Sequence, residues 1–215
     1  MSIRLLDCTL RDGGYINDWK FGYRTAKSII QKLVDSNADY VEVGFLRNCS
    51  YDKNATLFNN IAELKKILPR EQKNTKFTVM ALHNKYDITK LEPNDGIVEA
   101  VRVTFHDYDI DEGLEFVKKV MEKGYKCFCN PINIMGYSDQ EILNLIQKIN
   151  QIKPYAFSIV DTFGSMIKSD LLRIYSLLEH NLDKSIVIGL HLHENLSLSY
   201  SLAQEFIGMR NVNRD

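Results

Sequence analysis

The sequence predicts an α/β protein with a parallel sheet, organised as a single domain over residues 1–215. Short strand-like runs alternate with segments of helical periodicity along the whole chain, which is typical of parallel β-α-β folds. Several of these runs are almost continuously apolar, such as residues 186–190, as expected where helices cover both faces of a sheet. No Pro- or Ser-rich joint interrupts the alternation.

Seven strands are expected from these runs. They are residues 4–7, 40–44, 76–82, 100–104, 126–131, 155–160 and 186–191. The pattern alone is compatible with an open doubly wound sheet and with a (β/α)8 barrel. The sequence ends after the helix that follows the seventh strand, which is one strand short of a closed barrel.

The segments between the strands carry apolar stripes at helical spacing. These stripes lie in residues 26–34, 57–68, 116–121, 142–149, 171–178 and 198–206, with a short helix expected over 87–91. Ser138 followed by Glu141 is typical of a capping box at a helix start, and Gly124 is a plausible helix C-cap.

Composition excludes several classes of protein. Lys and Arg total 27 and Asp and Glu total 28, so the formal net charge is −1 and the basic excess of a nucleic-acid binder is missing. No apolar stretch approaches the about 20 residues that span a bilayer, and the N-terminus does not resemble a signal peptide. The four cysteines form no CxxC pair and are interpreted as reduced packing residues, so we expect a cytoplasmic protein.

Functional groups of parallel α/β folds collect at the carboxyl ends of the strands. Arg11 and Asp12 follow the first strand on a glycine-containing turn, where they offer a cation and a carboxylate or form a self-neutralising ion pair. Glu42 stands between two valines in the second strand and therefore points opposite to them. Unless it faces outward at the strand end, this charge needs a cationic partner, and Arg11 is the natural one.

His191 and His193 end the seventh strand. Residues two apart on a strand project from the same face, so the two imidazoles can reach one metal ion, although the pair could also be ordinary surface or core histidines. Asp12 as a third ligand would complete a set of two histidines and one carboxylate, which leaves open positions on a divalent cation.

Polar side chains also follow the fifth and sixth strands. Asn130 ends the fifth strand, and Asp161 and Thr162 follow the sixth before a glycine turn. These three residues are candidates for substrate binding at the rim, while the Asp-Thr pair could instead start the next helix.

Together, Asp7-x-Thr-Leu-Arg11-Asp12-Gly13, Glu42 and His191-x-His193 resemble the DRE-TIM metallolyases, the family of 3-hydroxy-3-methylglutaryl-CoA lyase. Within it, Asp161-Thr-Phe-Gly-Ser-Met and the stretch from His191 to Ser199 are most similar to 4-hydroxy-2-oxovalerate aldolases. The resemblance implies a TIM barrel, here truncated after its seventh β/α unit.

The resemblance also implies roles for the matched residues. Asp12, His191 and His193 would bind Mn²⁺ or Mg²⁺, Arg11 would stabilise an enolate oxygen, and Glu42 would orient Arg11. The implied activity is carbon–carbon bond cleavage, or its reverse, in a small 2-oxo acid through a pyruvate-type enolate. A Claisen-type acyl-CoA condensing enzyme and a non-catalytic barrel scaffold are the alternatives.

Two departures from the aldolases stand out. Tyr15 occupies the place of their acid–base histidine, and a tyrosine hydroxyl is a poor base at neutral pH. The eighth strand is also missing, which would leave two sheet edges uncovered. We therefore expect a piece of a longer protein, and a homo-oligomer if the piece is stable alone.

Overall fold

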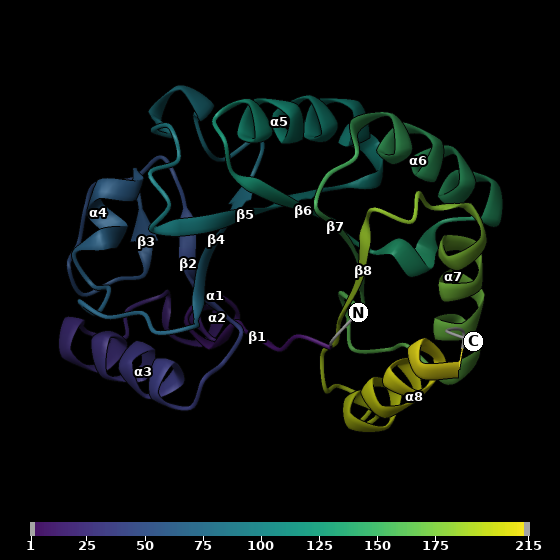
Figure 1. Cartoon of the computed structure of the whole chain (residues 1–215), viewed down its shortest axis with the longest axis horizontal. Coiled ribbons are helices and arrows are strands. Elements are labelled where there is room, and N and C mark those ends of the chain that lie inside the picture. The colour runs from purple at the N-terminus through teal and green to yellow at the C-terminus, as the bar shows by residue number, and fades with distance from the viewer. Residues whose placement is uncertain (1–2, 213–215) are drawn as a thin grey trace. The chain divides into compact units, whose positions relative to one another are not determined.

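The computed structural model describes residues 3–212, and all seven predicted strands are present in it (Figure 1). They are β1 (Leu6–Asp7), β2 (Tyr40–Leu46), β4 (Lys76–Leu82), β5 (Val98–Phe105), β6 (Lys126–Pro131), β7 (Ala156–Val160) and β8 (Val187–His191). A short strand that the periodicity does not predict, β3 (Leu57–Phe58), pairs with β2. The chain therefore has the predicted parallel α/β fold.

The helices follow the apolar stripes. They are α3 (Tyr23–Asp35), α4 (Ile61–Lys65), α5 (Ile110–Glu122), α6 (Asp139–Ile152), α7 (Lys168–Asn181) and α8 (Ser199–Val212). Two single turns, α1 (Thr9–Asp12) and α2 (Gly14–Asn17), follow β1, and the 3-10 turns are η1 (Ile88–Lys90), η2 (Asp107–Asp109) and η3 (Ile134–Gly136).

The helix expected over residues 57–68 is shorter than predicted. Leu57 belongs to β3, and α4 begins only at Ile61. The side chain of Asn60 accepts a hydrogen bond from the backbone N–H of Glu63 and so caps the helix at this point. An Asn side chain that accepts from a first-turn N–H fixes the start of the helix, so α4 begins after Asn60 although the apolar spacing extends back to Leu57.

Contacts divide the chain into two compact units. The first unit comprises residues 3–104 and 115–127, and the second comprises residues 105–114 and 128–212. In the first, β1, β2, β4 and β5 pair in that order, all in parallel. Valines at alternate positions of β2, Val41 and Val43, are fully buried, and α3 contributes Ile30 and Val34 to the same core.

The second unit has a parallel sheet of its own. β6 pairs with β7 and β7 with β8, with Phe128 opposite Ala156 and Phe157 opposite Ile188. Ile149 of α6 and Leu178 of α7 are fully buried, which is the covering by helices that continuously apolar strands require. None of the helices between residues 3 and 212 is long and apolar enough to cross a bilayer.

The predicted capping box at the start of α6 is confirmed. Ser138 Oγ accepts from the backbone N–H of Glu141, and the Glu141 carboxylate accepts from the backbone N–H of Ser138 at 2.7 Å. We expect Ser138→Ala to lower the free energy of unfolding by about 1 kcal/mol. Urea unfolding followed by circular dichroism measures the change. Ser28→Ala, on the exposed face of α3, is the control and should lose nothing; equal values for both variants would contradict the prediction.

Candidate active site

The first unit holds a buried ion cluster built around Glu42 of β2. Oε2 of Glu42 accepts hydrogen bonds from Nε of Arg11 at 2.7 Å and from Nη1 of Arg102 at 2.9 Å. Glu42 is 0% exposed, Arg11 5% and Arg102 3%. The predicted pairing of Glu42 with Arg11 is thus confirmed, and an outward-facing Glu42 is excluded.

Arg11 is held from a second side by its sequence neighbour. Nη1 donates to Oδ1 of Asp12 at 2.7 Å, so the turn ion pair that the sequence suggested as an alternative is present as well. Burial alone lowers the pKa of Arg11, but the adjacent carboxylates of Glu42 and Asp12 outweigh it and raise that pKa. Among the residues described, none accepts from Nη2, whose N–H groups stay available to a ligand.

Cys8 lies beside this cluster without adding charge to it. Its Sγ is 3.9 Å from Oδ2 of Asp12. Burial, reinforced by the negative charge of Glu42, raises the pKa of the Cys8 thiol to about 12. The sulfur is therefore a neutral thiol at pH 7 and a weak nucleophile in this state.

A tight turn after α2 places an indole over the backbone of Arg11. Nε1 of Trp19 donates to the carbonyl oxygen of Arg11 at 2.7 Å. The turn is made by Asp18 and Trp19, both with left-handed backbone angles (φ 53° and 59°). Gly14 must be glycine here, because a Cβ atom would overlap the Trp19 ring. Strained backbone of this kind persists where surrounding contacts fix it.

β2 carries a β-bulge directly after Glu42. Glu42 pairs with Thr78 of β4, but the next pair joins Phe45 to Met80, so β2 has one extra residue in this interval. The extra residue reverses the alternation of faces beyond the bulge. Phe45 therefore faces the cluster, and the Arg11 guanidinium lies 5.8 Å from the centre of its ring.

The second unit holds the two histidines. The His191 and His193 rings lie 4.9 Å apart and nearly perpendicular, at the carboxyl end of β8. Nδ1 of His193 is 2.6 Å from the carbonyl oxygen of Asp161, which can only accept a hydrogen bond. Nδ1 must therefore carry the proton, and the ring lone pair lies on Nε2, as in many metal-binding histidines.

The Asp161 and Thr162 side chains organise the loop after β7. Oδ1 of Asp161 accepts from the backbone N–H of Ser165 at 2.9 Å and of Met166 at 3.3 Å, ahead of α7. Oγ1 of Thr162 accepts from the backbone N–H of Asn133 at 2.7 Å. These bonds order loop backbone and do not reach α7, which begins at Lys168 and is capped by Asp170 at Ile167. Substrate contacts by Asp161 or Thr162 stay a prediction.

Gly164 joins this loop to the segment that follows the histidines. Its φ is +63°, and a Cβ atom there would lie 2.7 Å from Cβ and from the backbone N of Asn195. The carbonyl of Gly164 also accepts from the backbone N–H of Leu196 at 3.1 Å. The loop after β7 thus supports the backbone of the loop after β8.

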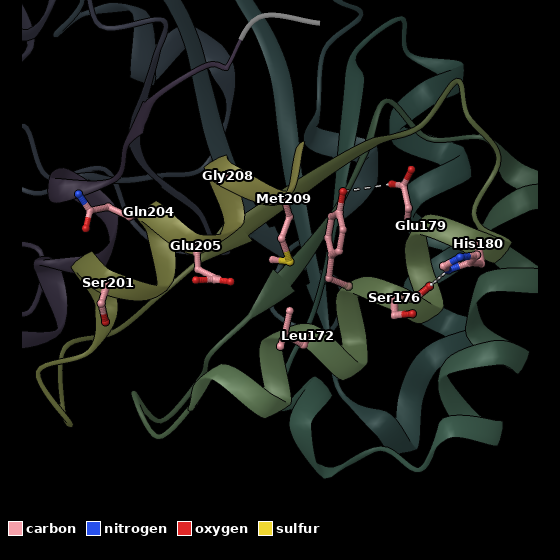
Figure 2. Close-up of a pocket in the computed structure, with 10 residues that line it drawn as sticks. Leu172, Ser176, Glu179, His180, Ser201, Gln204, Glu205, Gly208 and Met209 are labelled. Carbon is pink, nitrogen blue, oxygen red and sulfur yellow. Dashed lines mark hydrogen bonds between the residues drawn. The ribbon is translucent and has the colours of Figure 1, made fainter. Parts of the chain in front are cut away.

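A separate groove lies between α7 and α8 (Figure 2). Leu172, Tyr175 and Met209 line it, together with the carboxylates of Glu179 and Glu205. Lys184 pairs with Glu179 at 3.3 Å and Lys168 with Glu205 at 3.0 Å, so both charges are neutralised. The described lining includes none of the predicted site residues, and the groove carries no candidate chemistry.

The predicted site residues divide between the units. The first unit contains Arg11, Asp12, Tyr15 and Glu42, and the second contains Asn130, Asp161, Thr162, His191 and His193. The first unit brings Arg11, Asp12 and Glu42 together. Tyr15 is 64% exposed, with its ring 4.9 Å from that of Trp19, and Asn130 is buried with Nδ2 donating to the carbonyl of Phe128. The convergence of Asp12 with the two histidines, and every catalytic role, stay predictions.

Sequence reasoning missed Arg102. It stands between Val101 and Val103 in β5, the same pattern of one charge between two valines that singled out Glu42. Two charged residues of opposite sign in this pattern, on strands of one parallel sheet, are a signal that they share a face and pair there.

Solved structures share this fold. A candidate aldolase N-terminal domain from Bacteroides vulgatus has a TM-score of 0.77 at 23% identity, covering 96% of this chain and 69% of that one. HMG-CoA lyase from Bacillus subtilis has a TM-score of 0.73 at 13% identity, covering 97% and 74%. The carboxyl transferase domain of Rhizobium etli pyruvate carboxylase, with pyruvate and biocytin, has a TM-score of 0.70 at 14% identity, covering 96% and 38%.

These likenesses define the class of fold, a parallel α/β sheet of the TIM-barrel type. The family model for HMGL-like proteins matches residues 2–211, nearly the whole chain. The chain therefore belongs to the HMGL-like family, whose members typically use a divalent metal.

Proposed function

We propose that this chain is a divalent-metal-dependent carbon–carbon lyase, an aldolase acting on a small 2-oxo acid of the 4-hydroxy-2-oxovalerate kind. The observation that carries the proposal is the geometry of Arg11. Glu42 and Asp12 hold its guanidinium from two sides, and the described residues leave the Nη2 donors unused. Donors fixed in advance stabilise an oxyanion as it forms without reorganising, usually the largest single catalytic effect.

In the proposed cleavage the bond between C3 and C4 of the substrate breaks. The 4-hydroxyl group loses its proton, C4 becomes the carbonyl carbon of an aldehyde, and the electron pair of the broken bond forms the enolate of pyruvate. Protonation at C3 then gives pyruvate. Arg11 donates to the oxygen on C2, where the negative charge of the enolate gathers, and Glu42 keeps the guanidinium in place.

The residues proposed to hold the metal offer a mixed oxygen and nitrogen donor set, one carboxylate from Asp12 and two imidazoles from His191 and His193, which can bind a divalent cation. The family resemblance favours Mn²⁺ or Mg²⁺, which would act as a Lewis acid on the 2-oxo acid. The hydrogen bond from Nδ1 of His193 to the carbonyl of Asp161 supports this assignment, because it leaves Nε2 as the basic ring nitrogen.

We assign the protonation at C3 to Tyr15, which stands where the similar aldolases carry a histidine, because its neutral hydroxyl can donate a proton although it is a poor base at neutral pH. Its hydroxyl belongs to a largely exposed side chain on α2, one turn beyond Arg11. Asn130, Asp161 and Thr162 are proposed to border the substrate, since Asn130 lies at the carboxyl end of β6 and the other two follow β7. A Claisen-type acyl-CoA condensing enzyme of the same family is the second candidate, because it would use the same Arg11, Asp12 and histidines.

Two measurements test the proposal. Mn²⁺ binding is followed by calorimetry, and exchange of the pyruvate methyl protons with deuterium is followed by NMR, because exchange requires the enolate. His191→Ala should weaken Mn²⁺ binding at least about tenfold and reduce exchange, since it removes one of three ligands. His180→Ala is the control, because the bond that His180 makes within the described part of the chain is to its own helix, at the Ser176 carbonyl. Exchange without added metal, or strict dependence on coenzyme A, would contradict the aldolase.

A further inference from the structure

Arg47 is a positive charge that the proposed chemistry leaves unused. It directly follows β2, at the carboxyl end where Arg11 also lies. Its guanidinium packs on two aromatic rings, with Cζ 4.8 Å from the centre of the Phe45 ring and 5.8 Å from that of Trp19. Its Nε is buried and has no hydrogen-bond partner, and it forms no ion pair with the part of the chain that the structure describes.

The bulge in β2 brings this side chain to the site. Without the extra residue, Arg47 would alternate to the face opposite Glu42; with it, Phe45 and Arg47 both share the face of Glu42. Phe45 confirms the geometry independently, because its ring contacts the guanidinium groups of Arg11 at 5.8 Å and of Arg47 at 4.8 Å. Bulges are common beside active sites, where they redirect a side chain.

Charge and hydration make Arg47 suited to an anion. Arg11 and Arg102 share the carboxylate of Glu42, whereas Arg47 has no carboxylate partner among residues 3–212. Packing on Trp19 and Phe45 removes part of the water around the guanidinium, which strengthens its attraction for a negative group. A guanidinium fork matches the oxygens of a carboxylate or a phosphate.

We propose that Arg47 binds a carboxylate or phosphate group carried by the aldehyde half of the substrate. This inference rests on the proposed function, in which Arg11 receives the oxygen on C2 of the 2-oxo acid. Arg47 and Arg11 both contact the Phe45 ring, and in this proposal Arg47 meets the part of the substrate beyond the cleaved bond. The substrate class is thus a 4-hydroxy-2-oxo acid with a second anionic group.

The first test needs neither metal nor turnover. Trp19 is the single tryptophan of the chain and lies against Arg47, so its fluorescence reports on anions bound there. The metal-free protein is titrated with succinate and with phosphate at constant ionic strength. We expect a saturable change, at least tenfold weaker in Arg47→Met and partly retained in Arg47→Lys.

The matched control is Arg24→Met, which removes the same charge from an exposed position of α3. It should titrate like the original protein. Equal titrations for Arg47→Met and Arg24→Met, or a response of the original protein that follows ionic strength alone, would overturn the proposal.

The second test compares matched aldehydes in the condensation with pyruvate. Succinic semialdehyde is compared with butanal, and glyceraldehyde 3-phosphate with glyceraldehyde. We expect one anionic aldehyde to exceed its neutral partner at least tenfold in kcat/KM, and this ratio to approach one in Arg47→Met. A larger ratio for succinic semialdehyde over butanal indicates a carboxylate, and a larger ratio for glyceraldehyde 3-phosphate over glyceraldehyde indicates a phosphate.

The two proposals fail in different ways. Metal-dependent deuterium exchange into pyruvate with no preference for anionic aldehydes would overturn the role of Arg47 and leave the aldolase standing. An Arg47-dependent fluorescence titration without any deuterium exchange would overturn the aldolase and retain an anion-binding Arg47.

Discussion

Replacing Glu42 with Gln is expected to lower the free energy of unfolding by about 3–5 kcal/mol, the usual cost of breaking a buried ion pair. Gln matches Glu in shape but carries no charge, so the variant leaves the guanidinium groups of Arg11 and Arg102 buried and mutually repelling. In the original protein the single Oε2 atom of Glu42 accepts from both. Urea unfolding followed by circular dichroism measures the loss.

Glu99→Gln is the matched control. Glu99 also pairs with two cations, Lys76 at 3.3 Å and Lys126 at 2.6 Å, but these pairs lie at the surface, with both lysine side chains about half exposed. Exposed ion pairs contribute about 0–1 kcal/mol, so this variant should lose little. A Glu42→Gln loss as small as that of Glu99→Gln would show that the buried cluster does not stabilise the fold.

The same variant separates stability from catalysis. Arg11 retains Asp12 as a partner in Glu42→Gln, but it loses the contact at Nε that fixes the plane of its guanidinium. Under the proposed function, deuterium exchange into pyruvate should therefore fall even at urea-free conditions where the variant is fully folded. A folded variant with undiminished exchange would remove Glu42 from its role in positioning Arg11.

The parts of this molecule that the sequence predicts are those in which the period of apolar residues is regular. Continuously apolar runs identified the seven strands, and one charge between two valines identified Glu42 as a buried group that needs a cation. Both inferences use only the alternation of side chains along a strand and the cost of burying a charge. Arg102 carries the same signal, because it also stands between two valines in a buried strand.

The placement of Arg47 could not be predicted in this way. Strict alternation from Glu42 puts residue 47 on the opposite face, and only the extra residue at the bulge reverses this. The bulge depends on Thr56, whose carbonyl accepts from the backbone N–H of Phe45 at 3.0 Å. The order of apolar and polar residues in β2 does not reveal this hydrogen bond, because it joins β2 to a different segment of the chain. The turn at Asp18 and Trp19 has the same origin, since the carbonyl of Trp19 accepts from the backbone of Thr56.

Gly44→Ala tests this account of the bulge and is expected to lower the free energy of unfolding by about 3 kcal/mol or more. Gly44 has φ +153°, and an added Cβ would overlap the carbonyl oxygen of Thr56. The overlap is with backbone, which cannot rotate away as a side chain would. Relief requires that β2 move away from Thr56 or that the extra residue leave the bulge, and loss of the bulge turns Phe45 and Arg47 from the face of Glu42.

Two readouts distinguish these consequences from general destabilisation. Gly96→Ala is the control, because Gly96 also has a positive φ (+85°) but an added Cβ would have no atom within 4 Å among the described residues beyond its chain neighbours. Gly96→Ala shows how much stability an alanine at a positive φ costs without a steric overlap. The additional loss of unfolding free energy in Gly44→Ala therefore measures the overlap with Thr56. Folded Gly44→Ala should also lose the response of Trp19 fluorescence to succinate or phosphate, which Gly96→Ala should keep. Similar stabilities for the two variants, with both responses intact, would show that the bulge does not orient Arg47.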